Sequence, residues 1–219
     1  MSNTKERPTL LIVDDHPSVA DAHALSFEAE FTIVGTASDA NSGLAIARDL
    51  VPCLVLMDVV MAGKCPFAAT REITSQTSAK VLLWTGSDRE NYLDRALHAG
   101  ASGLVAKGSE TIPELCSILR RALKGGFYVS RPWESRLNEL EAGAPQNPLA
   151  LITETQVYAM RMIAEGASRR EIAKALEVTQ RELAKELSGC RELLGAKTDL
   201  RLIYRAMAEG ILLEEHLRP

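Results

Sequence analysis

The first half of the chain is predicted to be an α/β protein, a doubly wound parallel sheet, and the second half to be all-α. Short apolar runs alternate with helical segments through residues 1–126. These runs are unbroken, as expected for strands of a parallel sheet that are buried on both faces. Past residue 150, Ser/Thr-x-x-Glu/Gln boxes mark successive helix starts instead.

Five βα units account for the first half. The predicted strands cover residues 9–14, 32–37, 53–57, 80–84 and 103–106. The predicted helices cover residues 17–28, 40–50, 67–75, 89–98 and 112–124. Asp39 and Ser109 stand where helix caps belong, and Pro113 suits a first helical turn. Five consecutive βα units imply right-handed crossovers and a doubly wound sheet.

A linker is predicted after this domain. Gly125-Gly126 ends the last helix, and residues 127–129 form a short extended piece. The stretch 130–150 is rich in proline and glycine around a charged segment, which is typical of a linker, with one short helix over 133–140. The domains expected are therefore 1–126, a linker over 127–150, and 151–219.

The second domain is predicted to hold four helices, over residues 153–165, 169–176, 179–193 and 198–211. Three capping boxes begin the first three helices: Thr153 with Gln156, Ser168 with Glu171, and Thr179 with Glu182. The short joints at 166–167 and 177–178 fit the turns of a helix-turn-helix.

Composition indicates a cytoplasmic globular protein. The chain has 219 residues, 46% hydrophobic and 25% charged, and no apolar run approaches the ~20 residues that span a bilayer. The first residues lack the apolar core of a signal peptide, so no membrane partner is expected. The four cysteines show no paired spacing, which favours free thiols in a reducing compartment.

Charge divides unevenly between the two halves. Residues 1–148 carry 14 Lys/Arg and 18 Asp/Glu, whereas residues 149–219 carry 11 of each. A DNA-binding module usually has a basic footprint, and the second half has none overall.

Five polar side chains stand at the ends of the apolar runs. They are Asp14, Asp15, Asp58, Thr85 and Lys107. In a parallel sheet, sites form just outside the carboxyl ends of the strands, so these side chains are expected at one edge. Clustered carboxylates repel one another and favour a hard cation such as Mg2+. The lysine and the threonine suit a phosphoryl group carried on one carboxylate.

This spacing resembles the receiver domain of a two-component response regulator, and the last helices resemble a LuxR-type helix-turn-helix. The pairing is that of the NarL/FixJ family. The resemblance implies a flavodoxin-like receiver with a five-stranded parallel sheet in the order 2-1-3-4-5, joined to an all-α helix-turn-helix output domain. It also implies a non-enzymatic regulator that a partner sensor histidine kinase phosphorylates.

The resemblance assigns a role to each site residue. Asp58 would accept the phosphoryl group, Lys107 would pair with it, and Thr85 would hydrogen-bond it. Asp15 would bind Mg2+ directly, and Asp14 through water or a hydrogen bond. Asp58 and the backbone carbonyl of Val60 would complete the protein's share of the metal sphere.

Some neighbours depart from the family pattern. The usual proline after the phosphoacceptor is Ala62, and Pro66 replaces a usual glycine. Leu104 stands where the family has a switch aromatic, with Trp84 and Tyr92 as candidate substitutes.

The recognition helix also departs from the family. Glu182, Ala184 and Glu186 stand where the family has a neutral donor, a lysine and a histidine. Glu182 could instead be the capping partner of Thr179, so both roles are open. The best candidates for phosphate contacts are Arg169, Arg170, Arg181 and Lys185.

Two functions follow from these observations. The first is a phosphorylation-controlled transcription regulator that binds DNA. The second is a response regulator whose divergent helix-turn-helix acts through protein–protein contact, or binds DNA weakly or with a partner. A homodimer is compatible with either, through residues 88–103 or through the last helix and tail at 200–217.

Overall fold

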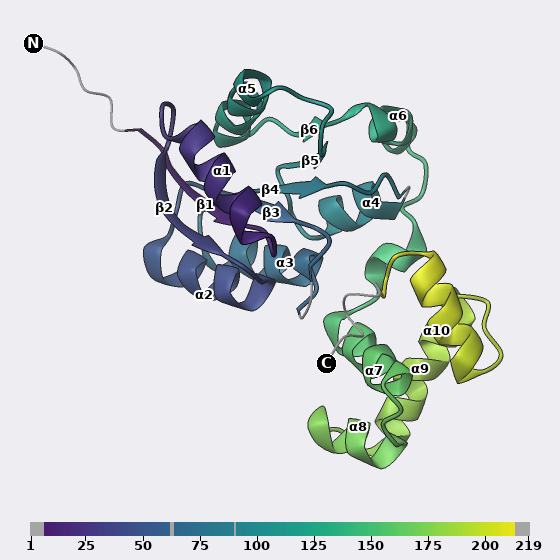
Figure 1. Ribbon diagram of the computed structural model, residues 1–219. Helices are drawn as coiled ribbons and strands as arrows, with labels where there is room; N and C mark the ends of the chain where they lie inside the picture. The colour runs from purple at the N-terminus through teal and green to yellow at the C-terminus, as the bar shows by residue number, and fades with distance from the viewer. Residues whose placement is uncertain (1–6, 62–63, 90, 213–219) are drawn as a thin grey trace, which may run out of the picture. The chain divides into compact units, whose positions relative to one another are not determined.

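The structure is a computed structural model that describes residues 7–61, 64–89 and 91–212. The chain divides into two compact units, residues 1–144 and 145–219. Figure 1 shows the sheet and its helices in the first unit and the helices alone in the second. No helix among the described residues is long and apolar enough to cross a membrane.

The first unit is built on a parallel sheet in the order β2-β1-β3-β4-β5-β6. The described strands are β1 (Thr9–Val13), β2 (Thr32–Ala37), β3 (Leu54–Asp58), β4 (Lys80–Thr85), β5 (Gly103–Ala106) and β6 (Tyr128–Val129). The five predicted strands and their order are confirmed, but the prediction of five strands in all was wrong. The sixth pairs in parallel with β5, Gly103 lying opposite Tyr128 and Leu104 opposite Val129.

Helices cover both faces of this sheet (Figure 1). They are α1 (Pro17–Phe27), α2 (Ala40–Leu50), α3 (Pro66–Gln76), α4 (Asn91–His98) and α5 (Ile112–Leu123). One core cluster joins the sheet to α2, α3 and α4, and the other joins it to α1 and α5. The continuous apolar runs of the central strands follow from this, since alternate residues enter opposite clusters.

Caps set several helix starts. Asp39 caps α2, its Oδ1 accepting from the backbone N–H groups of Asn41 and Ser42. The expectation that Ser109 caps the fifth helix was wrong. Thr111 is the N-cap of α5, because Glu114 three residues later accepts hydrogen bonds from the backbone N–H and hydroxyl of Thr111.

Much of the stretch expected to be linker belongs to the first unit. After β6 come a short 3₁₀ turn, η1 (Arg131–Trp133), and a helix, α6 (Glu134–Glu141). Trp133 is 1% exposed within the α2–α3–α4 cluster, and its indole N–H donates to the carbonyl of Arg89 at 2.9 Å. Arg136 forms a two-pronged ion pair with the buried Asp94 of α4, at 3.0 and 2.8 Å. These contacts dock α6 on the first unit.

The second unit begins with a 3₁₀ turn, η2 (Pro148–Leu151), and is otherwise helical. Its helices are α7 (Glu154–Ala164), α8 (Arg169–Ala175), α9 (Gln180–Leu193) and α10 (Asp199–Ala208). All three predicted capping boxes are present, and Thr198 caps α10. One apolar cluster holds the four helices together. The tail that the sequence analysis offered as a dimer surface, beyond residue 212, lies outside the described residues.

Candidate functional site

The five predicted strand-end residues lie at one edge of the sheet. Asp14 and Asp15 follow β1, Asp58 and Thr85 are the last residues of β3 and β4, and Lys107 follows β5. Asp14 is 3% exposed, Asp58 is 4% exposed and Thr85 is fully buried. Because the strands are parallel and adjacent in the order β1-β3-β4-β5, their carboxyl ends lie side by side at the same edge of the sheet.

Lys107 joins two of the carboxylates. Its Nζ lies 2.6 Å from Oδ2 of Asp58 and 2.9 Å from Oδ2 of Asp14. The other oxygen of Asp58 accepts from the backbone N–H of Val60 at 3.0 Å, and the other oxygen of Asp14 accepts from that of His16 at 2.9 Å. Both buried carboxylates are therefore held by a cation and a backbone donor, which fixes their orientation.

The pKa values of the two carboxyl groups are shifted in opposite directions from the ordinary value. Burial is the largest influence on Asp58 and raises its pKa, and the bond from Lys107 offsets this only in part. Burial also acts to raise the pKa of Asp14, but Lys107 and the His16 N–H together hold it below the ordinary value. Burial acts to lower the pKa of Lys107, but Asp58 and Asp14 together raise it above its ordinary value, so the ammonium stays charged.

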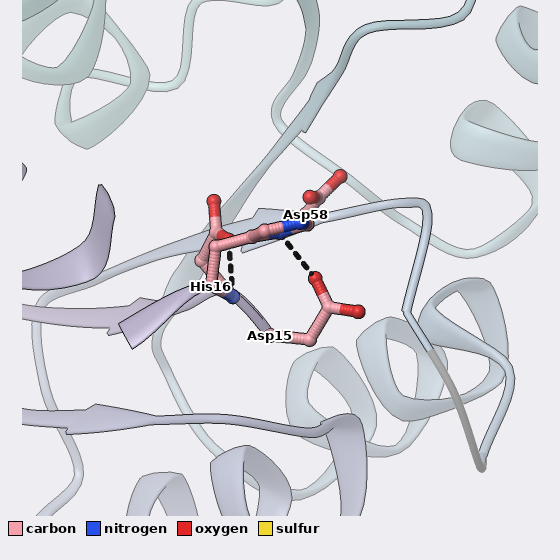
Figure 2. A group of neighbouring side chains, drawn as sticks. Asp15, His16 and Asp58 are labelled. Carbon is pink, nitrogen blue, oxygen red and sulfur yellow. Dashed lines mark hydrogen bonds and ion pairs between the residues drawn. The ribbon is translucent and has the colours of Figure 1, made fainter. Parts of the chain in front are cut away.

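A third carboxylate and a histidine complete the cluster, as Figure 2 shows. Asp14, Asp15, His16 and Asp58 each offer one ligand atom, and these atoms all lie within 4.8 Å of one another. Asp15 Oδ1 is buried without a hydrogen-bond partner and lies 2.8 Å from Nδ1 of His16. The sequence analysis missed His16, because a single histidine beside two aspartates has no metal-ligand spacing.

This donor set fits a divalent cation. Three carboxylates and one ammonium leave an excess of two formal negative charges at a largely buried position. Mg2+ prefers hard oxygen ligands and is usually bound through one or two carboxylates together with phosphate oxygens. The buried Oδ1 of Asp15, in an ion-pair contact with His16 at 2.8 Å, is the kind of hard oxygen that such a cation would bind. The proposed contribution of the Val60 carbonyl stays a prediction.

Thr85 is placed beside the carboxylates by strand pairing. Asp58 lies opposite Trp84 in the β3–β4 ladder, so Thr85 extends one residue further along the next strand. Its hydroxyl oxygen accepts from the backbone N–H of Ser87 at 3.1 Å. Its carbonyl accepts from the N–H of Lys107 at 2.7 Å, which ties the ends of β4 and β5 together.

The departures from the family pattern lie nearby. Leu104 is fully buried in the cluster that also holds Tyr92 and Trp133. Pro66 is the first residue of α3, where proline suits the first turn. Ala62 lies outside the described residues.

The four predicted phosphate contacts differ in their surroundings. Arg170, Arg181 and Lys185 are exposed on α8 and α9. Arg169 instead forms an ion pair with Asp199 of α10, which Arg191 also contacts at 3.0 Å. Arg169 is thus engaged in holding α8, α9 and α10 together.

The two glutamates of α9 have partners within the second unit. Oε2 of Glu182 accepts from the backbone N–H and the hydroxyl of Thr179, both at 2.8 Å. Oε2 of Glu186 accepts from the side-chain amide of Gln156 in α7 at 2.8 Å. The capping role of Glu182, which the sequence left open, is therefore the one that the structure has.

Known proteins resemble the chain over nearly its whole length. A family model for the response regulator receiver domain matches residues 10–120. The transcriptional regulatory protein YdfI of Bacillus subtilis is 28% identical, covering 93% of this chain and 97% of its own. LiaR of the same organism is 30% identical, covering 78% and 82%. The nitrate/nitrite response regulator NarL of Escherichia coli is 26% identical, covering 82% and 85%.

Solved structures agree with these relatives. A LuxR-family two-component response regulator from Aurantimonas is 28% identical with a TM-score of 0.57, covering 63% of this chain and 99% of its own. RcsB from Salmonella enterica, bound to a promoter in the presence of the phosphoryl mimic BeF3−, is 20% identical with a TM-score of 0.61. It covers 91% of this chain and 98% of its own, and at this identity the likeness concerns the fold.

Proposed function

This chain belongs to the NarL/LuxR family of two-component response regulators, and from that membership we propose that a partner histidine kinase phosphorylates it on Asp58 to control transcription. The observation that carries the proposal is the position of Lys107 between two buried carboxylates, 2.6 Å from Asp58 and 2.9 Å from Asp14. A cytoplasmic location follows from the proposed partners, a kinase and DNA.

Transfer of the phosphoryl group would use Asp58 as the nucleophile. A carboxylate oxygen of Asp58 forms a bond to phosphorus as the bond from phosphorus to the kinase's histidine nitrogen breaks, and the electron pair leaves with that nitrogen. Lys107 is charged and in place to pair with the phosphate oxygens. The Thr85 hydroxyl, one residue beyond Asp58 on the next strand, is available to hydrogen-bond them.

Asp14, Asp15 and Asp58 would hold a Mg2+ ion, with the carbonyl of Val60 as a further ligand. The ion would supply positive charge at the carboxylates and at the phosphoryl oxygens. The burial of Asp14 and Asp58, which share the one ammonium of Lys107, supports a need for such charge.

Direct phosphorylation tests the assignment. Incubation with acetyl phosphate and Mg2+ should add one phosphoryl group, detected as a mass increase of the intact protein. Asp58→Asn should abolish it, whereas Asp49→Asn, an exposed carboxylate on α2, should not change it. Equal labelling of Asp58→Asn would show that another residue accepts the group.

For the output unit we propose DNA binding through α8 and α9, with Arg170, Arg181 and Lys185 at the phosphates and Arg169 chiefly structural. Two features support this function over a protein-binding one. Glu182 is turned back onto its own helix, and Glu186 is hydrogen-bonded to Gln156, so both carboxylates keep their charge but are oriented by partners within the second unit. The likeness to RcsB, which binds a promoter, agrees with it.

Salt dependence separates DNA binding from protein contact. Each lost phosphate contact should flatten the slope of log affinity against log salt by ~0.9. Fluorescence anisotropy should therefore give a shallower slope for Arg181→Ala and for Lys185→Ala than for wild type. Arg120→Ala, in the first unit, is the control and should keep the slope. Absence of any salt-dependent binding to promoter DNA would favour the alternative, a helix-turn-helix that contacts a protein.

We also propose that the chain forms a homodimer through α10. Leu200 and Tyr204 lie one turn apart on this helix and are 83% and 71% exposed. Light scattering at tens of micromolar should detect a dimer that Leu200→Glu weakens, and Leu25→Glu on α1 is the matched change at another exposed leucine. A monomer at all concentrations, with or without BeF3−, would contradict this.

A further inference from the structure

We propose that Trp84 is a positioning residue for Lys107, and that its indole face keeps the ammonium at Asp58 during phosphoryl transfer. The proposal rests on the proposed function, because the lysine acts on a phosphoryl group only if Asp58 receives one. The proposal adds Trp84, the residue before Thr85 at the carboxyl end of β4, to the five side chains at the edge of the sheet.

Strand pairing places the backbone of Trp84 between the strand that carries Asp58 and the strand that leads to Lys107. It lies opposite Asp58 in the β3–β4 ladder and opposite Val105 in the β4–β5 ladder. Its carbonyl accepts from the N–H of Val59 at 3.2 Å. Lys107 follows Val105 by two residues and so projects to the same face of the sheet as Trp84.

The side chain of Trp84 closes one side of the lysine. The Lys107 ammonium lies 5.5 Å from the centre of the Trp84 ring, within the range of about 6 Å for a cation–π interaction. The ammonium also contacts Asp58 and Asp14, at 2.6 and 2.9 Å. It is therefore held between two carboxylates and an aromatic ring, although the lysine side chain is still 27% exposed.

Helix α1 holds the indole in place. The His23 ring packs edge-on against Trp84 with ring centres 4.4 Å apart. Phe27, one turn later on α1, lies 6.1 Å from His23 in a stacked arrangement. Trp84 itself is 8% exposed in the α1–α5 cluster, so its orientation is set by packing.

This restraint has a purpose in the reaction. Lysine carries its charge on a flexible four-carbon stem with several rotatable bonds, and a partly exposed ammonium can turn to water. When Asp58 becomes an acyl phosphate, the carboxylate that attracted Lys107 loses its charge, and the lysine must stay to pair with the phosphoryl oxygens. The aromatic face does not change in that step, so it keeps the ammonium near the phosphorus.

The initial rate of Asp58 phosphorylation tests this inference. With acetyl phosphate and saturating Mg2+, Trp84→Leu should slow labelling about two- to fivefold, the factor expected for one exposed cation–π contact. Trp84→Phe keeps an aromatic face and should recover most of the rate. Ile118→Val perturbs the same apolar cluster from α5 rather than through His23 and Phe27, and it should label as fast as wild type. Equal rates for wild type and Trp84→Leu would overturn the proposal.

A double-mutant cycle shows whether Trp84 acts through the lysine. In a Lys107→Gln background, which labels slowly, adding Trp84→Leu should cause no further loss of rate. If Trp84→Leu instead slowed labelling as much in Lys107→Gln as it does in the wild-type protein, Trp84 would act independently of the lysine. That result would also overturn the proposal. Failure of wild type to be labelled on Asp58 would instead refute the proposed function, so the two failures are distinct.

A spectroscopic measurement covers the case in which Trp84→Leu does not fold. Trp133→Phe leaves Trp84 as the single tryptophan, because the chain has two. Its emission should change when Mg2+ and BeF3− are added, since the neighbouring ammonium is drawn to the mimic. Lys107→Gln in this background should remove the change. An identical change without the lysine would contradict the contact.

Discussion

At the scale of single residues, Glu182 illustrates how local hydrogen bonds decide a role. Its carboxylate accepts from the backbone N–H and the hydroxyl of Thr179, while the N–H of Glu182 donates back to that hydroxyl at 3.2 Å. This reciprocal pair satisfies two donors that the start of a helix leaves without partners. A glutamate that sequence comparison places toward DNA is therefore a structural residue of α9.

The pH dependence of stability should reflect this cap. The Thr179 N–H, and then its hydroxyl, lower the pKa of Glu182 below its ordinary value of 4.5. A carboxyl with a lowered pKa in the folded state contributes stability above its unfolded pKa and loses it as the pH falls through its folded pKa. Glu182→Gln should therefore be less stable than wild type at pH 7, and the difference should disappear as the pH falls through the lowered pKa of Glu182.

Urea unfolding at several pH values measures this difference. Glu192→Gln is the matched control, because Glu192 is an exposed glutamate near the other end of α9. A difference for Glu182→Gln that stays constant with pH would show that its charge has no part in the cap.

At the scale of secondary-structure elements, the docking of α6 depends on one ion pair and one aromatic side chain. Asp94 is 1% exposed, and the side chain of Arg136 is 17% exposed. The bond to Asp94 raises the pKa of Arg136, so the guanidinium stays charged. Leu137 and Leu140 pack on the same cluster as Trp133, so α6 presents an apolar face to that cluster.

Breaking the pair should be strongly destabilising, because it removes the main cation from a buried carboxylate. Arg136→Ala should lower the free energy of unfolding by about 3 kcal/mol. Arg120→Ala removes an exposed pair with Glu30, at 47% and 44% exposure, and should lose less than about 1 kcal/mol. Similar losses for the two variants in urea unfolding would show that α6 contributes little to the first unit.

Two helical glycines should respond oppositely to the same change. A Cβ at Gly43 of α2 would lie 2.7 Å from Cγ2 of Val13 in β1, whereas a Cβ at Gly189 of α9 would meet nothing within 4 Å. Gly43→Ala should therefore be destabilising by about 1–3 kcal/mol, because α2 must move off the sheet. Gly189→Ala should be stabilising by about 0.5–1 kcal/mol, because alanine has less backbone entropy to lose. Thermal unfolding of both variants tests the pair.

At the scale of the whole molecule, the sequence predicted the elements that have a strong repeating signal. The central strands are long apolar runs, and three of the four helices of the second unit begin at capping boxes, so these elements were predicted correctly. Residues 127–129 were predicted to be extended, but strand β6 within them has two residues, too few for a period that would indicate its pairing with β5. Trp133 is one aromatic residue among charged neighbours, and only the fold places it in a core.

The sequence also predicted which residues form the site, but not the contacts among their side chains. Residue type and strand context brought five side chains to one edge. The Lys107 bridge, the closeness of His16 and the aromatic contact of Trp84 depend on side-chain orientation, which sequence spacing does not define. The cap of α5 was assigned to Ser109 although Glu114, three residues after Thr111, is the signal of a capping box.

Because η1 and α6 pack on the first unit, that unit extends to residue 144 and not to residue 126, the predicted end of the domain. A fragment of residues 1–144 keeps β6, Trp133 and Arg136, whereas a fragment of residues 1–126 loses all three. The shorter fragment should be less stable by at least about 3 kcal/mol, the loss typical of removing one buried tryptophan. Denaturant unfolding of the two fragments compares them directly. Equal stability would mean that the segment only rests on the surface.

The docking of α6 also sets the reach of the chain that joins the two units. Only residues 142–147 lie between the end of α6 and the start of η2, a tether of roughly 20 Å when fully extended. If the segment from residue 130 came free, the tether would reach roughly three times as far. The local concentration of one tethered module around another falls steeply with tether length. The ion pair of Arg136 with Asp94 thus limits the length of free chain that joins the two units.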